Sequence, residues 1–478
     1  MSSTINLKFI FFITFLFIIL QDCAVIIGSQ LLYIAPFFIL ISTLVVILNN
    51  YKKITSKIVN IYKCTPCKYF IWFLLFISVT TFFHNNFTEE IFILSRTILI
   101  FWFTILPSIL FAVLCIPQYI SYKKTLNILL YSSFFILIYG LLEFSYKLLF
   151  LKEIPFSYLF CAKKFIGAFI ENSSWSNGTL RRASSIFFEP SFFATFIFLF
   201  MPLAYLLLNS KIKINRNYKA DKIFKLILIL LFWLCLFFTK SPIYIIFCII
   251  YTVIFFHKNI IKLLNKNIFV SIILIISLIL SCFTLNNIKL ENDVYSRIFK
   301  SLESFGDLNN LINSEPSLAT RVISTLTTFN ASKKHIFIGT GYGNAKEVMY
   351  NEYINGELPL TYEIITIGIN KDNCVPSPNI FWSSLLQFGY IATFMLYVFF
   401  FKTLYDAIKI KKYFHYKERL LLEAIIQIAI NYIIISFYWT IINYPMIWFI
   451  FGILNSYILT YKLYLKKKKQ IYFEVRNV

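Results

Sequence analysis

The lysines of this chain alternate from side to side along a series of apolar stretches. About twelve of these stretches are long enough to cross a bilayer, since a transmembrane helix needs roughly 20 apolar residues. The connecting segments are alternately rich and poor in lysine, and most of the 45 Lys and Arg residues fall in the rich set. Because positive loops stay in the cytoplasm, we expect an all-α, multi-pass protein of the bacterial inner membrane with both termini in the cytoplasm. The expected spans are residues 5–22, 24–48, 66–83, 91–116, 125–151, 191–209, 223–239, 242–257, 267–285, 379–402, 420–442 and 445–463.

The composition agrees with burial in lipid. Hydrophobic residues make up 59% of the chain and charged residues only 14%, whereas about a quarter of a soluble domain is charged. A net charge of +23 would point to nucleic acid in a soluble protein. Here the orientation signal and attraction to the anionic cytoplasmic leaflet account for it, so we expect the lipid bilayer and not nucleic acid as partner.

The cysteines and the N-terminus give no sign of a metal site or a cleaved leader. Cys64 and Cys67 form one C-x-x-C without a second pair at zinc spacing, so we expect no metal. Cys161 and Cys374 fall in outer loops, and the sequence leaves open whether they form a disulfide. No small-x-small cleavage site follows the first apolar stretch, which we therefore expect to be retained as a span.

Two outward-facing loops are longer than simple connections. The first covers residues 152–190, and the second covers residues 286–378. Loops of the second length usually carry function. Apolar periodicity predicts helices over Tyr295–Leu311 and Leu318–Phe329, which would form a small cap on the outer face. The expected organisation is residues 1–285 with nine spans, residues 286–378 as a large periplasmic loop, and residues 379–478 with three spans and a basic tail.

The first candidate site is the segment Arg182-Ala-Ser-Ser-Ile-Phe-Phe-Glu189-Pro190, which runs into the sixth span. Glu189 would lie near the N-cap of that helix, where the helix dipole stabilises a carboxylate. Arg182 would lie close to the bilayer surface, where a guanidinium can bind a phosphate through two hydrogen bonds. The simpler alternative is a capped helix preceded by an interfacial arginine.

The second candidate site lies in the large outer loop. Arg321 is followed by His335 and by the turn Gly339-Thr-Gly341-Tyr-Gly343. No strand–helix context surrounds these glycines, so a dinucleotide fold is excluded, although glycine does allow close backbone approach to a ligand. His335 is the imidazole best placed for proton transfer. The alternative is a loop histidine that only packs.

Ionisable residues also occur inside the expected spans. Arg96 and Glu143 lie at similar depths below the outer surface, which makes them a plausible ion pair. Lys147, one helical turn from Glu143, is a competing partner. We favour a structural pair over a role in substrate binding.

Four features, taken together in this order, make the chain resemble the superfamily of O-antigen polymerases and O-antigen ligases. They are Arg182 with Phe187-x-Glu189-Pro190-Ser191 at the start of a span, Thr239-Lys-Ser241 between adjacent spans, Arg321 before His335-Ile-Phe-Ile-Gly-Thr-Gly-Tyr-Gly, and Pro378-Asn379 before Leu385-Leu-Gln-Phe-Gly389-Tyr-Ile. The features cover about residues 180–390, and the flanking spans match in number and topology.

The resemblance implies metal-independent, cofactor-free glycosyl transfer on the outer face of the inner membrane. The donor would be a sugar chain on undecaprenyl diphosphate, and the acceptor would be the sugar end of another lipid-linked unit. By position, Arg182 and Arg321 would bind the diphosphate with Arg181 beside them, and Gly341 and Asn379 would line the substrate site. Glu189 or His335 would be the general base, with Glu189 favoured because it adjoins the motif arginine. A chain-length regulator would be a further partner.

Three other functions compete with a polymerase. A ligase would transfer glycan to lipid A core, but Pro378 stands where the ligase pattern often has a histidine before the asparagine. A polysaccharide flippase or transporter usually shows internal repeats, which this chain lacks. A scaffold protein would leave the large outer loop unexplained.

Overall fold

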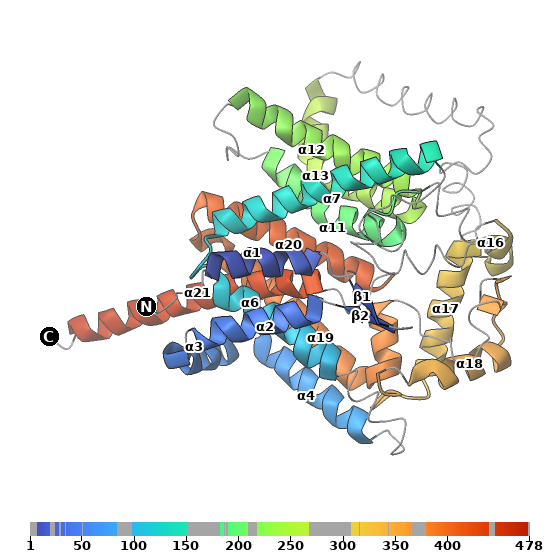
Figure 1. The fold of residues 1–478 in the computed structure, drawn as a ribbon, viewed down its shortest axis with the longest axis horizontal. Helices are drawn as coiled ribbons and strands as arrows, with labels where there is room; N and C mark the ends of the chain where they lie inside the picture. The colour runs from blue at the N-terminus through green and yellow to red at the C-terminus, as the bar shows by residue number, and fades with distance from the viewer. Residues whose placement is uncertain are drawn as a thin grey trace.

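The computed structural model describes residues 7–19, 24–27, 30–33, 35–49, 51–83, 98–150, 182–185, 187, 190–208, 218–266, 307–314, 316–342, 344–362, 364–365, 379–438 and 445–476. Across these residues the chain is helical apart from one short hairpin, in agreement with the expected all-α class (Figure 1). The N-terminal half contains α1 (Leu7–Ile19), α2 (Ala35–Leu48), α3 (Tyr51–Cys64), α4 (Cys67–Phe83), the π-helix η1 (Ile98–Ile105), α6 (Leu106–Cys115), α7 (Tyr122–Phe150), α11 (Pro190–Leu208), α12 (Tyr218–Thr239) and α13 (Pro242–Lys266). The C-terminal half contains α16 (Leu308–Ser314), α17 (Pro316–Ser332), α18 (Ala345–Asn355), α19 (Ile380–Ile410), the 3-10 helix η3 (Lys411–Tyr413), α20 (Tyr416–Ser436) and α21 (Pro445–Arg476).

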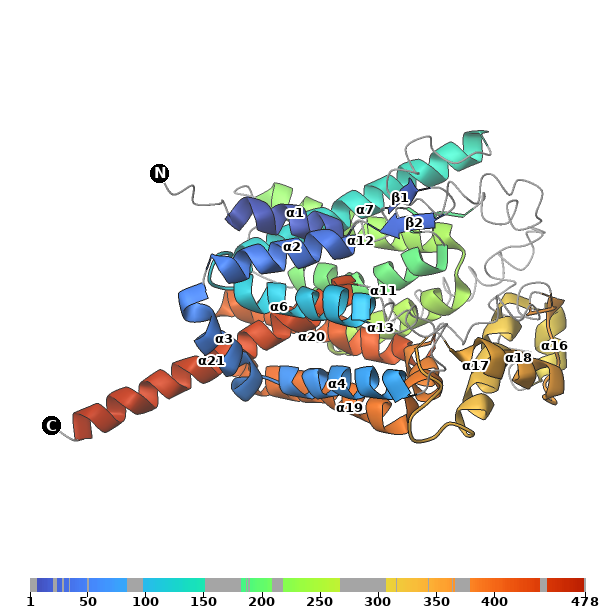
Figure 2. The same ribbon diagram turned by 60° about the horizontal axis from the view of Figure 1, so that its bottom comes forward.

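The long helices form a bundle with a small helical cap at one end. Helix α21 packs against α6, α11 packs against α12 and α20, and α19 packs against α4. Helices α16, α17 and α18 lie together at one end, and the C-terminal part of α21 projects from the opposite end (Figure 2). We call α16–α18 with the turn up to Tyr342 the cap. The cap has its own small apolar core, which includes Ile323, Met349 and Tyr353.

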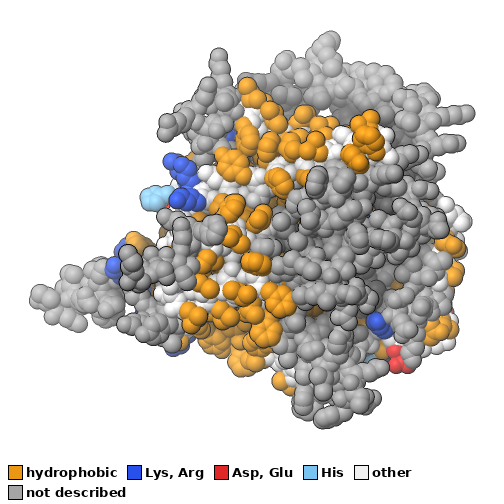
Figure 3. Space-filling view, in the orientation of Figure 1, with side chains coloured by type: hydrophobic (Ala, Val, Ile, Leu, Met, Phe, Trp, Pro, Cys, Tyr) orange, Lys and Arg blue, Asp and Glu red, His pale blue; other side chains and the backbone are white. Residues whose placement is uncertain are grey.

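Several helices have the length and apolar character of membrane spans. Within the described residues these are Tyr122–Phe150, Pro190–Leu208, Ile380–Tyr413, Tyr416–Ser436 and Pro445–Lys468, and the bent pair α3–α4 makes a sixth candidate. Four shorter apolar helices, at Ala35–Leu48, Ile100–Cys115, Ile223–Thr239 and Ile243–Phe255, accompany them. Exposed hydrophobic side chains spread over one face of the bundle, and Lys and Arg gather at the end from which α21 projects (Figure 3). These features are those of a membrane protein, while the count of twelve spans stays a prediction.

Some of the expected span and helix boundaries differ in the structure. Residues 24–48, expected as one span, form an antiparallel hairpin of β1 (Ala24–Ile27) and β2 (Gln30–Tyr33), with Ala24 opposite Tyr33, followed by α2. The sequence Gly28-Ser29 between the strands suits a two-residue turn, which competes with a continuous helix. The helix expected at Leu318–Phe329 is confirmed as part of α17. The expected span 267–285 and most of the helix expected at Tyr295–Leu311 lie outside the described residues.

The cap is joined to the bundle through a break in α19. Gly389 has φ 77° and interrupts the helix, which frees backbone groups around it. The cap completes their hydrogen bonds, because Thr340 N donates to Leu386 O at 2.8 Å, Gly341 N donates to Gln387 O at 2.9 Å, and Tyr390 N donates to Ile336 O at 2.8 Å. Unpaired backbone groups inside an apolar bundle are costly, so this pairing allows the break to exist.

Gly389 is required at the break on two counts. A left-handed backbone disfavours any residue with a Cβ by about 1–2 kcal/mol. A Cβ at this position would also come within 2.4 Å of Phe337 O, which is too close for any contact. The close backbone approach that glycine permits is therefore used here between the cap and α19.

We expect Gly389→Ala to lower the apparent midpoint of thermal unfolding in detergent clearly, by an amount equivalent to at least about 1–2 kcal/mol. Ile391→Ala is the matched control, because it lies two residues further along α19 with a side chain that is 42% exposed. Equal midpoints for the two variants would mean that the break does not depend on glycine.

Candidate functional site

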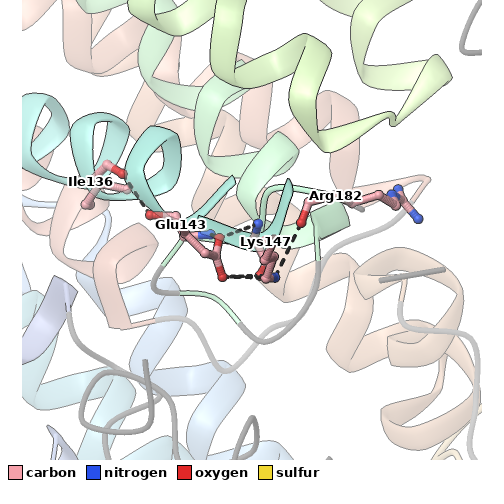
Figure 4. A network of polar contacts seen from close by, with 6 residues as sticks. Ile136, Glu143, Lys147 and Arg182 are labelled. Carbon is pink, nitrogen blue, oxygen red and sulfur yellow. Dashed lines mark hydrogen bonds and ion pairs between the residues drawn. The ribbon is translucent and has the colours of Figure 1, made fainter. Parts of the chain in front are cut away.

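A buried carboxylate on α7 holds the segment that contains Arg182. Glu143 is fully buried, and its Oε2 accepts hydrogen bonds from the backbone N–H groups of Ser184 at 2.8 Å and Ser185 at 2.5 Å. Its Oε1 accepts a further bond from the Ser184 hydroxyl at 2.9 Å. Figure 4 shows this network, in which α7 lies against the segment from Arg182 onward. Three donors aimed at one carboxylate fix the path of residues 182–185.

Lys147 neutralises Glu143 within the bundle. Its Nζ lies 3.1 Å from Glu143 Oε1, and the two side chains are 1% and 0% exposed. The same ammonium donates to Ser184 Oγ at 3.3 Å and to Arg182 O at 3.4 Å (Figure 4). Lys147, the competing partner in the sequence, is therefore an ion-pair partner of Glu143. Arg96 lies outside the described residues.

Two further contacts fix this segment between α7 and α12. Ser185 has φ 53°, and its hydroxyl donates to Ile136 O on α7 at 2.7 Å. On the other side, Ala183 N donates to Phe238 O near the end of α12 at 2.8 Å. Small residues are needed here because the segment passes between two packed helices.

The guanidinium of Arg182 binds the turn between α12 and α13. Its Nε donates to Thr239 O at 2.7 Å, and its Nη2 donates to Ser241 Oγ at 3.2 Å and to Lys240 O at 3.4 Å. The last carbonyls of a helix carry partial negative charge and have no partner within the helix. Two of the sequence features, Arg182 and Thr239-Lys-Ser241, are thus one structural unit.

Arg321 approaches the start of α13 from the cap. Its Nη1 donates to the Tyr438 hydroxyl at 3.3 Å, and the Tyr438 ring lies 6.2 Å from the ring of Tyr244. Tyr244 stands in the first turn of α13 and accepts a hydrogen bond from Thr195 Oγ1 on α11 at 2.6 Å. Arg321 also interacts electrostatically with Tyr244.

Arg182 therefore contacts the start of α13 directly, and Arg321 is linked to it through Tyr438. Arg182 contacts Ser241. Arg321 contacts Tyr438, whose ring packs on that of Tyr244, three residues after Ser241. We call these five residues the arginine site. A helix N-terminus and two guanidinium groups together make a positive environment suited to an anion.

Asn379 supports the arginine site from the start of α19. Its Oδ1 accepts from Trp382 N at 3.2 Å, which makes it the N-cap of α19. Its Nδ2 donates to Phe437 O at 2.5 Å and to Tyr438 O at 3.3 Å. Asn379 is buried and fixes the backbone of Tyr438, the residue that contacts Arg321.

His335 and Gly341 lie at the junction of the cap with α19. His335 is half-buried in the turn that follows α17, and its carbonyl accepts from Gly339 N at 3.2 Å. Gly341 is buried, with its N–H bonded to Gln387 O. Arg181 and Glu189 are outside the described residues, so the favoured base stays a prediction.

The sequence patterns did not identify Tyr438, Tyr244 or the hydrogen bonds that Glu143 accepts from residues 184 and 185. One signal for Tyr438 was available, since tyrosine is enriched where spans meet the membrane surface. The spacing of four residues between Glu143 and Lys147 was the signal for their pair. The contact of Glu143 with Ser184 joins residues 41 positions apart and leaves no local pattern.

Metal-binding side chains do not cluster in the part of the chain that the structure describes. No three His, Cys, Asp or Glu residues in that part are arranged to hold an ion. Cys64 and Cys67 are both free thiols. Cys161 and Cys374 lie outside the described residues.

Comparison with known families adds no relative. No family model matches this chain, and a search of curated proteins finds no match either.

We expect Glu143→Gln and Lys147→Met each to destabilise the protein by about 3–5 kcal/mol, because each leaves an uncompensated buried partner. The double variant should lose clearly less than the sum of the two, because neither charge is then left alone. The measurement is the apparent unfolding midpoint in detergent.

Arg419→Gln is the control, since Arg419 and Glu423 form a pair with the same spacing whose side chains are 46% and 25% exposed. Its effect should stay below about 1 kcal/mol. Additive effects of Glu143→Gln and Lys147→Met would contradict the buried pair.

Proposed function

We propose that this protein polymerises lipid-linked oligosaccharide repeat units into a surface polysaccharide such as O-antigen. The donor is an oligosaccharide on undecaprenyl diphosphate, and the transfer takes place at the periplasmic face of the inner membrane. The observation that carries the proposal is the arginine site, where Arg182 contacts the turn before α13 and Arg321, from a separate segment, contacts Tyr438, which packs on Tyr244 of α13.

The chemistry of the leaving group explains why two arginines are needed. The hydroxyl oxygen of the acceptor sugar forms a bond to the anomeric carbon of the donor, and the bond from that carbon to the diphosphate oxygen breaks. The diphosphate leaves with the bonding electrons, so negative charge grows on it during the transfer. Fixed guanidinium groups stabilise that charge most where it develops, and removing one such group typically reduces the rate about 10²–10³-fold.

The surroundings of the arginines suit this role. Arg182 donates to Thr239 O and Ser241 Oγ, and Arg321 donates to the Tyr438 hydroxyl. These bonds fix the orientation of the two guanidinium groups. A preorganised cation needs little rearrangement when the substrate arrives.

The proton of the acceptor hydroxyl must pass to a base. Glu189, one residue before the first helical residue Pro190 of α11, remains the favoured base because it adjoins the Arg182 segment. His335, at the junction of the cap with α19, is the alternative.

One observation favours a second function, that of a polysaccharide transporter. Transporters often contain helices broken within the membrane, and α19 is broken at Gly389. The freed backbone groups bond to the cap, however, which assigns the break a structural purpose. The two functions differ in phenotype, since a lost transporter leaves no repeat units outside the cell, whereas a lost polymerase leaves single units there.

We expect Arg182→Lys and Arg321→Lys, in cells lacking the native gene, to abolish long glycan while single repeat units still reach the surface. Lysine keeps the charge but offers a single point donor without the planar fork that binds a diphosphate. Gel electrophoresis of surface glycan measures the chain length, and immunoblots check the protein level. Arg419→Lys is the control, because Arg419 is in the first turn of α20, whereas Tyr438, the partner of Arg321, follows the last turn of the same helix.

Normal glycan ladders from both lysine variants at normal protein level would remove the proposed diphosphate site. Loss of all surface repeat units would support the transporter instead. Transfer of complete glycan to a different acceptor would identify a ligase.

We also expect Tyr438→Phe to shorten the glycan chains and to slow polymerisation about tenfold, since it removes one hydrogen bond to a charged group. The phenylalanine ring would still pack against Tyr244, so the fold should be preserved. Tyr405→Phe is the control, because this tyrosine is 60% exposed on α19. An unchanged chain-length distribution for Tyr438→Phe would show that Arg321 does not depend on this bond.

A further inference from the structure

Helix α3 lies across the end of the bundle rather than along it. It connects α2 to α4, and its axis is bent by 93° from that of α4. It lies near α21 at the end of the bundle from which α21 projects (Figures 1 and 2). A helix perpendicular to the spans at this level lies parallel to the membrane plane.

The side chains of α3 divide into three faces. Ile61 is 2% exposed and belongs to the main apolar core of the protein. Ile58 and Tyr62, one turn apart, are 45% and 37% exposed, and Val59 beside them is 47% exposed. Asn60 and Lys63 lie on the remaining face, about 100–160° around the helix from Tyr62.

The polar positions of α3 carry only positive charge. Its sequence, YKKITSKIVNIYKC, contains four lysines and no acidic residue. Lys57 hydrogen-bonds to Gln118, which ties α3 to the chain after α6. Lys63 is exposed and falls on the same face as Ser56, seven residues or about two helical turns before it.

We propose that α3 is an interfacial helix that binds anionic phospholipid headgroups of the cytoplasmic leaflet. The exposed face of Ile58, Val59 and Tyr62 enters the boundary between headgroups and acyl chains, and Lys63 on the neighbouring face meets the lipid phosphates. An apolar face flanked by lysines is the arrangement by which helices lie on anionic membranes. Charge complementarity selects the lipid over a second copy of this chain, because a second copy would present the same lysines and repel them. This inference is independent of the enzymatic proposal.

The full chain in nanodiscs that contain phosphatidylcholine and phosphatidylglycerol provides the test. A photoreactive benzoylphenylalanine replaces Tyr62 in one sample and Asn60 in another, and mass spectrometry identifies what each captures after irradiation. The two positions lie on opposite sides of the same helix, so Asn60 is the matched control. We expect Tyr62 to capture phospholipid, enriched in phosphatidylglycerol relative to the bilayer, and Asn60 to capture at least several-fold less.

The charge is tested in the same assay. Lys63→Gln should reduce the phosphatidylglycerol enrichment at Tyr62 roughly fivefold, as each lysine near an anionic surface contributes about that factor. Lys466→Gln, on the projecting end of α21, should leave the enrichment unchanged. Capture of a second protein chain at Tyr62, equal lipid capture at Tyr62 and Asn60, or enrichment that survives the loss of Lys63 would each overturn the inference.

Discussion

The buried contact between Glu143 and residues 184 and 185 is the interaction on which the candidate site depends. A carboxylate without exposure to water needs strong partners, and here it has two backbone donors, one hydroxyl and one ammonium. The backbone and hydroxyl donors belong to the segment that carries Arg182. The hydrogen bonds that stabilise the buried carboxylate therefore also set the position of the arginine. Lys147 contacts both the carboxylate and the arginine segment, since it neutralises Glu143 and donates to the carbonyl of Arg182. The buried ions favoured as a structural pair thus organise residues that the functional argument uses.

Single side chains also link several helices on the side of the site that faces the cap. Asn379 caps α19 and also holds the end of α20, and the residue it holds there, Tyr438, supports Arg321. The N-terminus of α19, the C-terminus of α20 and the cap are therefore linked by one side chain at each step. The amide of Asn379 is engaged by Trp382, Phe437 and Tyr438, and the substrate-binding role expected for Asn379 stays a prediction.

Sequence patterns predicted the parts of this protein that depend on periodicity and on single residues. Apolar length predicted the helical, membrane-type architecture, and apolar period predicted α17. The pattern failed over residues 24–33, where eight of the ten residues form two strands. A hairpin and an apolar helix draw on the same residue types, so periodicity alone does not separate them. The chemistry of arginine identified Arg182 and Arg321 as candidates, but no sequence pattern identified their hydrogen-bond partners. Arg321 and Tyr438 are 117 residues apart, and Arg182 and Ser241 are 59 apart, and no local pattern encodes contacts over such distances. The glycines around Gly341 predict a close backbone approach, and the backbone of α19 makes one at Gly339 and Gly341, while the approach of a ligand there stays a prediction.

The break in α19 carries a consequence for how the chain is assembled. The groups that satisfy the broken helix, on residues 336–341, precede it in the chain and are synthesised before Gly389. Helix α19 can therefore reach its final hydrogen-bonding pattern only once the turn after α17 lies against it. Because that turn is synthesised first, the partners of the broken helix already exist when α19 leaves the ribosome.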